Sequence, residues 1–357
     1  MIHTSKAEVL AILALLVGGL AFVPTAAGDY ANDGQATAKF ATQSLNGADP
    51  HGATTVPFWT GSFNYLGTTY PYMMVGTDPA AGSAVSTIPT EIIPLKFSFS
   101  NGVSIDGTTK IQVTTASPIF QNASFISGTT QYGDAIQRAE FWNDVSRVSP
   151  GYHVLLGQPS IMPTVTLAVP SNQGFEFTSK FTHQPTGLVD FSWAINHVYS
   201  MLNGFSPQSL PIFLAYDVYF YVNDPSNCCI AGFHAVTSSR NGNGAQQVST
   251  LIEEAYADPG FFAVKIEDMS ILSHEVSEWL NDPFLLNQVP PWQVSAFYGC
   301  TNLLETGDPL VGVNFKVNGY HLQDEAFLSW FARQSPSTGI NGLYTYLGTF
   351  RTFSPSC

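Results

Sequence analysis

The H-E-x-x-E motif that begins at His274 combines residue types that can bind a metal ion and transfer a proton. Apolar residues at helical spacing predict a helix over residues 269–281, with Asp268 as its N-cap and Pro283 as its stop. On this helix His274 and Glu278 are four residues apart and project from one face. An imidazole nitrogen and a carboxylate oxygen in this arrangement can hold one divalent cation, for which Zn2+ is the expected ion.

The residue after the histidine, Glu275, is the candidate catalytic group. Beside a metal-bound water, its carboxylate can accept a proton and later donate that proton to a leaving group. The alternative interpretation is an ordinary amphipathic helix whose acidic side chains lie in solvent. Because ordinary helices often carry such residues, the motif alone leaves both interpretations open.

A metal site needs at least a third protein ligand, and the next acidic cluster contains Glu305 and Asp308. Glu305 can be the third ligand while Asp308 accepts the other ring N–H of His274 and fixes its tautomer, or the two acids can exchange these roles. The alternative is an ordinary acidic turn. His234 and His321 are further candidate ligands.

The predicted helix resembles that of zincin metallopeptidases, and a helix motif followed by a distant glutamate is similar to the gluzincin branch. Glu278 stands where that family has its second histidine, which makes the site more anionic and suits other divalent ions as well. The pattern S-H-E-x-x-E…D-P followed by E-x-G-D resembles secreted bacterial proteins over residues 233–308. A fainter likeness to plant Exordium-type secreted proteins implies no mechanism. The zincin resemblance implies a strand–helix unit, a metal-activated water, Glu275 as the base and a peptide or protein substrate.

Composition and other motifs argue against several further classes. With 12 basic against 26 acidic residues, a net charge of −14 and no basic cluster, the chain is not suited to nucleic acid or anionic lipid. It has no G-x-S-x-G nucleophile motif. Neighbouring acids such as Glu253 and Glu254 do not define two carboxylates across a sugar, so glycoside hydrolysis is disfavoured. The remaining alternative is a non-catalytic extracellular binding or surface protein whose helix site is structural or vestigial.

An apolar run over residues 9–23, after Lys6 and before small residues, predicts a cleaved export signal over residues 1–27. The run is too short to span a bilayer, so we expect a secreted or periplasmic protein without stable membrane insertion. The cysteines that follow are Cys228, Cys229, Cys300 and Cys357. In an oxidising compartment they predict two disulfides. A bond between neighbours closes a strained ring, so each of the first two is expected to pair with one of the last two.

Hydrophobic periodicity predicts an α+β fold in three parts after the signal. These are a flexible arm over residues 28–57, a β-rich region over 58–205, and a zincin-like metal-site region with the disulfides over 206–357. Strands are expected at residues 90–99, 110–114, 152–156, 164–169, 211–222 and 232–236, with the last two paired. Helices are expected at residues 134–148, 192–202, 248–257 and 269–281.

Overall fold

The computed structural model describes residues 48–357 except 150, 263, 296–298 and 353–356. The expected export signal and residues 28–47 of the expected arm lie outside the described residues. The described chain has a strand-rich N-terminal part together with several helices, so the predicted α+β class is confirmed. No helix in this part of the chain is long and apolar enough to cross a membrane.

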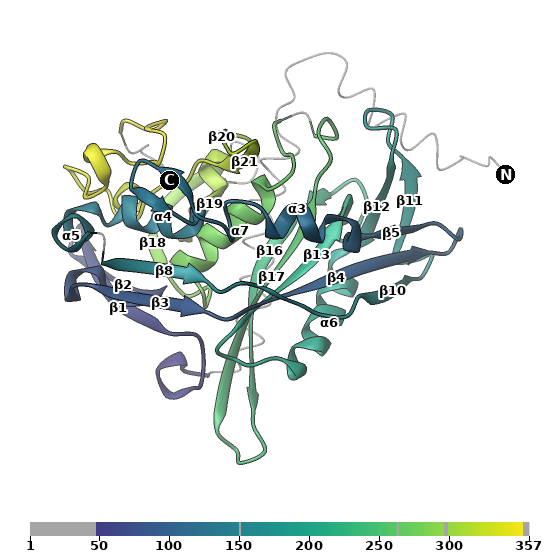
Figure 1. Ribbon diagram of the computed structural model, residues 1–357, viewed down its shortest axis with the longest axis horizontal. Helices are drawn as coiled ribbons and strands as arrows, with labels where there is room; N and C mark the ends of the chain where they lie inside the picture. Colours follow the sequence, from purple (N-terminus) through teal and green to yellow (C-terminus); the bar gives the residue numbers. More distant parts are fainter. Residues whose placement is uncertain (1–47, 150, 263, 296–298, 353–356) are drawn as a thin grey trace.

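A seven-stranded mixed sheet forms the centre of the fold (Figure 1). Its main path runs β10-β4-β13-β17-β16, and β5 and β9 pair with β4. The neighbours along this path are parallel except β16, which is antiparallel to β17. The strands are β4 (Thr90–Phe99), β5 (Ser104–Asp106), β9 (Ser160–Ile161), β10 (Val165–Val169), β13 (Leu210–Tyr216), β16 (Gly232–Arg240) and β17 (Gln246–Tyr256). The sheet therefore combines strands from both sides of the expected boundary at residue 205.

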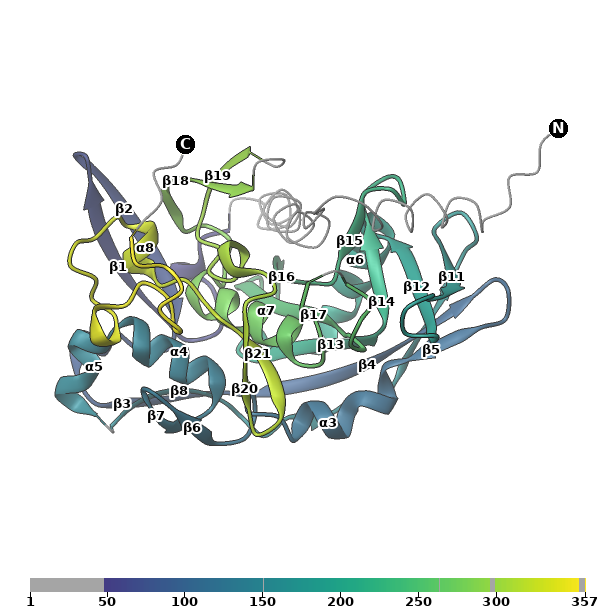
Figure 2. The same ribbon diagram turned by 90° about the horizontal axis from the view of Figure 1, so that it is seen from above.

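Smaller sheets surround this centre. A four-stranded sheet has the order β11-β12-β14-β15, with β11 (Gly174–Thr178), β12 (Pro185–Asp190), β14 (Val218–Tyr221) and β15 (Cys228–Ile230). Two-stranded pairs are formed by β1 (Phe58–Tyr65) with β2 (Thr68–Val75), β3 (Ala84–Ile88) with β8 (Tyr152–Leu156), β6 (Ala123–Phe125) with β7 (Gly128–Thr130), β18 (Gln288–Ser295) with β19 (Gly299–Leu303), and β20 (Asn314–Val317) with β21 (Tyr320–Gln323). The β20–β21 hairpin lies against the long helix α7 (Figure 2).

Six helices of the described chain accompany the sheets, and α7 packs directly on β16 and β17 of the central sheet. The helices are α3 (Ile111–Thr115), α4 (Tyr132–Glu140), α5 (Trp142–Val148), α6 (Phe191–Met201), α7 (Ser270–Asn281) and α8 (Leu328–Phe331). Successive residues of a strand point to opposite faces, so the central sheet separates two apolar layers. On β13, Ile212 and Leu214 belong to the layer that contains α4 and α7. Phe213 and Ala215 belong to the layer that contains α6.

Two expectations near the motif are wrong. Residues 248–257 form most of strand β17 rather than a helix, and residues 232–236 pair with β17 rather than with residues 211–222. A strand buried on both faces has a continuous apolar run without alternation, so its period does not distinguish it from a buried helix. Strand β17 lies between β13 and β16 and is buried without alternation over residues 250–255, although it includes polar residues.

Other elements agree with the sequence or differ at their ends. The expected strands at 90–99, 152–156 and 164–169 and the helix at 192–202 are confirmed as β4, β8, β10 and α6. Residues 110–114 are helical instead, because a 3-10 turn at Gly107–Lys110 continues directly into α3. The helix expected over 134–148 is divided at Phe141, whose backbone angles leave the helical region.

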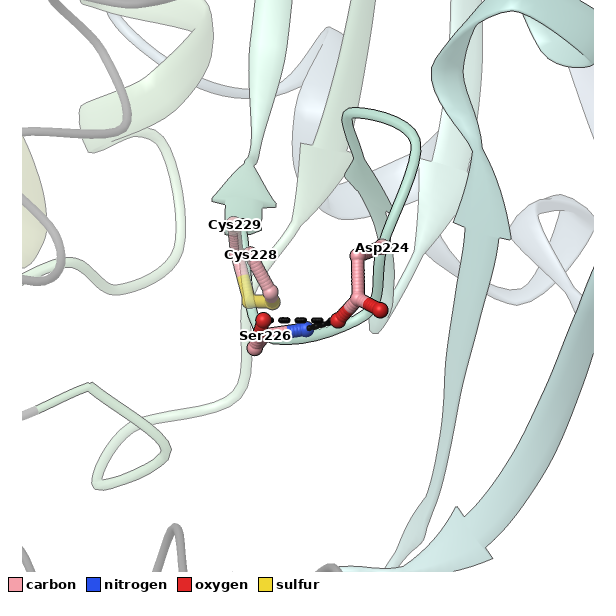
Figure 3. The surroundings of a disulfide bond; sticks show 4 residues. All are labelled: Asp224, Ser226, Cys228 and Cys229. Atoms are coloured by element: carbon pink, nitrogen blue, oxygen red, sulfur yellow. Dashed lines mark hydrogen bonds between the residues drawn. A yellow bond between two sulfur atoms is a disulfide. The ribbon is translucent and has the colours of Figure 1, made fainter.

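The disulfides also differ from the expected pattern. Cys228 is bonded to Cys229, and Cys300 is bonded to Cys357. Figure 3 shows the first pair at the start of β15, beside a turn in which Asp224 accepts two hydrogen bonds from Ser226. The prediction that Cys228 and Cys229 each bond to Cys300 or Cys357 is therefore wrong. Cys228 and Cys229 lie on β15 of the four-stranded sheet, whereas Cys300 lies in the separate β18–β19 pair.

Candidate metal centre

Helix α7 carries the motif and is buried along its whole length. Its neighbours are β16 and β17 of the central sheet, α4 and the β20–β21 hairpin. Apolar side chains point in several directions around it, which suits a helix enclosed on all sides. Glu275 and Glu278 are 0% and 3% exposed, so the interpretation in which these acids lie in solvent is wrong.

The start of α7 also differs from the prediction. Met269, not Asp268, occupies the N-cap position, and no side chain caps the helix. Asp268 instead contacts His321, with Oδ2 2.6 Å from Nδ1, and Glu267 lies 2.9 Å from the other ring nitrogen. His321 therefore joins the β20–β21 hairpin to the start of α7 and is not a member of the His–carboxylate cluster on that helix.

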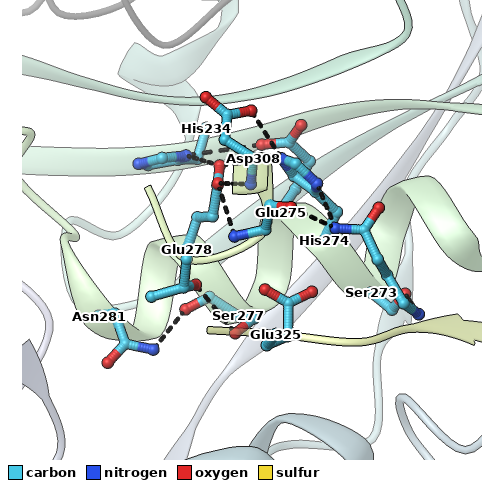
Figure 4. A network of polar contacts seen from close by, with 12 residues as sticks. His234, Ser273, His274, Glu275, Ser277, Glu278, Asn281, Asp308 and Glu325 are labelled. Atoms are coloured by element: carbon cyan, nitrogen blue, oxygen red, sulfur yellow. Dashed lines mark hydrogen bonds and ion pairs between the residues drawn. The ribbon is translucent and has the colours of Figure 1, made fainter. Parts of the chain in front are cut away.

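Three of the expected ligands converge (Figure 4). Nε2 of His274 lies 3.1 Å from Oε2 of Glu278 and 3.8 Å from Oδ1 of Asp308. One ligand atom from each residue lies within 4.8 Å of the others. Asp308 begins the 3-10 turn η5 (Asp308–Leu310), so this group joins two segments that are 30 residues apart. These buried groups can hold a metal ion.

A glycine allows the two segments to approach. The backbone N–H groups of Gly307 and Asp308 donate to Oε1 of Glu278 at 3.0 and 3.3 Å. A Cβ atom at position 307 would lie 2.4 Å from Nδ1 of His274, so only glycine leaves room for the ring. The backbone of the E-x-G-D segment therefore holds Oε1 of Glu278 and leaves Oε2 facing His274.

The other ring nitrogen of His274 meets Gln323, at the end of β21. The amide nitrogen of Gln323 lies 2.8 Å from Nδ1 and also donates to the carbonyl of Gly307 at 2.9 Å. In this arrangement Nδ1 accepts, so a neutral His274 ring carries its proton on Nε2, facing Glu278. Asp308 was expected either to accept the other ring N–H or to act as a ligand, and the structure places it beside Nε2, the position of a ligand.

A second triad shares Glu278. Nδ1 of His234, on β16, lies 3.5 Å from Oε2 of Glu275 and 3.7 Å from Oε2 of Glu278. These three residues also place one ligand atom each within 4.8 Å of the others. From the sequence His234 was only a further candidate ligand, because its contact with α7 depends on how β16 pairs with β17. Glu305 is buried but belongs to neither triad of the described residues.

Burial and mutual charge determine the protonation of the cluster. Burial raises the pKa of Asp308 well above its usual range, and the nearby charge of Glu278 adds to this effect. Burial also disfavours the charged form of Glu278, but the charge and hydrogen bond of His274 outweigh it and lower the pKa of Glu278. Burial lowers the pKa of His234 to about 4. His234 is therefore neutral near pH 7, as a metal ligand must be.

Gln323 had no signal in the sequence, since an isolated glutamine on a short hairpin does not indicate a role. Its position follows only from the packing of β21 against α7.

Comparisons with protein-family models, with curated proteins and with solved structures find no match for this chain.

Proposed function

We propose that this chain binds one divalent cation through His274, Glu278 and Asp308 and uses it to hydrolyse peptide bonds. The observation that carries the proposal is the convergence of one ligand atom from each of these three residues within 4.8 Å. One nitrogen and two carboxylate oxygens form a ligand set that suits Zn2+ and other divalent ions of similar preference. Three protein ligands also leave coordination positions for water and substrate.

Charge supports the proposal. Four ionisable side chains, His274, Glu275, Glu278 and Asp308, are each at most 5% exposed. Buried carboxylates are costly unless a positive charge compensates them. Among the described residues, lysine and arginine side chains form no ion pair with Glu278 or Asp308, so a divalent cation suits these two acids as a counter-charge.

Gln323 bears on the binding role of His274. When Nε2 binds a cation, the ring carries its proton on Nδ1 and needs an acceptor there. The side-chain amide of Gln323 lies 2.8 Å from Nδ1. Its oxygen can accept from a protonated Nδ1 only if the amide turns over and gives up the hydrogen bond that its nitrogen donates to the carbonyl of Gly307.

Glu275 is the proposed general base. It follows His274 directly on α7, and one of its oxygens lies within 4.8 Å of a ligand oxygen of Glu278. A bound divalent ion lowers the pKa of water and polarises a substrate carbonyl. The Glu275 carboxylate accepts the proton of the attacking water and then donates it to the leaving amine.

We also propose that the protein acts outside the cytoplasm. The two disulfides suit an oxidising compartment, which agrees with the export signal predicted over residues 1–27. Peptides or proteins in that compartment are the proposed substrates.

The test combines metal loading with Glu275→Gln, which keeps the side-chain size and removes the basic carboxylate. We expect the variant to retain the cation bound by His274, Glu278 and Asp308 and to keep its fold, while peptide hydrolysis falls about 10²-fold or more. Glu253→Gln is the matched control, because Glu253 is equally buried but points to the opposite face of β17, into the layer of Phe213. Loss of that cation in Glu275→Gln would contradict the role of base.

One observation favours a second candidate, a non-catalytic extracellular protein with a structural metal site. The ligands of the first triad are 0–5% exposed, and the clefts around Tyr72 and around Arg240 are lined by other residues. A metal ion enclosed by protein in this way suits a structural role. If metal-loaded protein cleaves nothing in a broad peptide mixture between about pH 3 and pH 8, while metal removal lowers its melting temperature, this second candidate replaces the first.

A further inference from the structure

We infer that His234, Glu275 and Glu278 form a second divalent-cation site, which is adjacent to the first and shares Glu278 with it. The inference deepens the proposed function and rests on it where hydrolysis is concerned. The second site draws His234 from strand β16 and its two carboxylates from α7, so it lies between the central sheet and the helix. Its ligand atoms are those of the second triad (Figure 4).

The geometry places the two sites on either side of one oxygen. Oε2 of Glu278 lies 3.1 Å from Nε2 of His274 and 3.7 Å from Nδ1 of His234. Oε1 is already held by two backbone N–H groups, so Oε2 is the atom that both ions share. Ions that share a carboxylate in two-metal sites lie about 3.5–4 Å apart.

A further buried carboxylate points into the same layer. In the antiparallel register, Glu254 of β17 is opposite Gly232 and His234 is opposite Ile252, so Glu254 and His234 share one sheet face. That face is covered by α7, and a Cβ atom at Gly232 would lie 3.1 Å from Cγ of Glu275. Glu254 therefore faces α7 from the same side of the sheet as His234.

Glu254 has no visible counter-charge. It is 0% exposed, and neither of its carboxylate oxygens has a hydrogen-bond partner among the described residues. A buried carboxylate without a partner is unfavourable in the protein interior. A cation held by His234 and Glu275 compensates Glu254 as well, either directly or through a bound water.

The second site has a consequence for the reaction. A cation there takes the Glu275 carboxylate as a ligand, and this is the group that the proposed mechanism needs as a base. Filling the first site therefore activates the protein, whereas filling the second inhibits it. Hydrolysis is expected to rise with the first equivalent of metal and to fall with the second.

The primary experiment measures binding and does not depend on activity. Metal-free full-length protein is titrated with Zn2+, and bound metal is counted by mass spectrometry and calorimetry. We expect two equivalents in the wild type and one in a folded His234→Asn variant. Glu254→Gln is expected to weaken the second equivalent at least tenfold, while Glu253→Gln, its equally buried neighbour on the other face, leaves two.

Mn2+ provides a readout of the shared ligand. Two ions that share one carboxylate oxygen give a spin-coupled electron paramagnetic resonance signal, which Glu278→Ala should abolish. Wild type that saturates at one equivalent overturns the second site, and so does His234→Asn that still binds two. If the wild type binds two equivalents of metal but hydrolyses no peptide at any metal loading, the second site stands and the peptidase proposal is wrong. Failure of the second site and failure of the peptidase proposal are therefore distinguishable.

Discussion

The carboxylate of Glu278 connects His274, one turn earlier on α7, to the segment that carries Asp308. Its Oε2 faces Nε2 of His274 at 3.1 Å, and its Oε1 accepts the N–H of Gly307 at 3.0 Å. One side chain thus fixes both the local pair on the helix and the approach of a distant turn. The remaining contacts of the centre are arranged around this relationship.

Glu278→Gln should separate the charge of this residue from its structural contact. The amide oxygen can still accept from Gly307, so we expect a folded protein, but the neutral group is a poor ligand. Cation affinity should fall at least tenfold, as measured by competition with a fluorescent chelator. Glu253→Gln controls for the loss of any buried acid. An unchanged affinity would show that Glu278 is not a ligand.

Gln323 should tune the affinity of His274. Gln323→Glu places a carboxylate beside Nδ1, stabilises the tautomer that binds metal and should raise cation affinity by about tenfold. Gln323→Leu removes the polar contact at Nδ1 and should lower the affinity by about 10- to 100-fold. The pair is measured by calorimetry at one pH. Equal affinities in both variants would mean that Nδ1 does not control the metal.

Outside the centre, Glu140 should make stability depend on pH. Burial raises the pKa of Glu140 to about 8, although hydrogen bonds from the backbone of Leu328 and from Asn281 oppose the shift. A carboxyl with a raised folded-state pKa stabilises the fold below its unfolded pKa, and this contribution is lost as pH rises from about 4.5 to about 8. The free energy of unfolding should therefore fall over this range.

Glu140→Gln tests this contribution because the amide is neutral at every pH and can still accept from Leu328. Relative to wild type, we expect little change near pH 5 and a gain of up to roughly 4 kcal/mol near pH 8.5. Urea unfolding in the presence of a chelator measures the difference without metal binding. The same wild-type-to-variant difference at both pH values would refute the assignment.

The two disulfides should contribute unequally to stability. The Cys300–Cys357 bond closes a loop with a sequence separation of 57, whereas Cys228 and Cys229 are neighbours. Replacing both members of the long-range pair by serine should lower the free energy of unfolding by about 2–4 kcal/mol, because loop closure restricts the unfolded chain. The same change at the adjacent pair should cost less.

Thiol titration under denaturing, non-reducing conditions provides an independent check of this pattern. We expect no reactive thiol, since both pairs are bonded and no described cysteine is free. Peptide mapping should link the segment of Cys300 to the C-terminus. Two reactive thiols per chain would contradict one of the bonds, and four would contradict both.

The pair His274 and Glu278 could be predicted from the sequence, because both residues lie on one helix and its geometry fixes their spacing. The spacing of His274 and Glu278 places both on one face of any helix, and α7 covers Ser270–Asn281 as the apolar pattern indicates. Asp308 could be named as a candidate because it lies in the next acidic cluster. Its position beside Nε2, however, depends on the close approach that Gly307 allows.

The non-local part could not be predicted in the same way. His234 reaches the centre only because β16 pairs with β17 and α7 packs on both strands, which are contacts between segments far apart in the chain. Glu254 was assigned to a helix because the buried strand β17 lacks alternation. Ring strain argued against a bond between Cys228 and Cys229, but these residues lie in a different sheet from Cys300 and bond to each other.

The central claim is that His274 belongs to a divalent-cation site. The most direct measurement is the metal content of purified, reconstituted and dialysed protein by inductively coupled plasma mass spectrometry. His274→Ala is compared with His321→Ala, which changes a histidine that also has two acidic neighbours but lies outside both triads. We predict at least one equivalent in wild type and in His321→Ala, and none at the first site in folded His274→Ala. Wild type without metal, or undiminished metal in His274→Ala, would contradict the account.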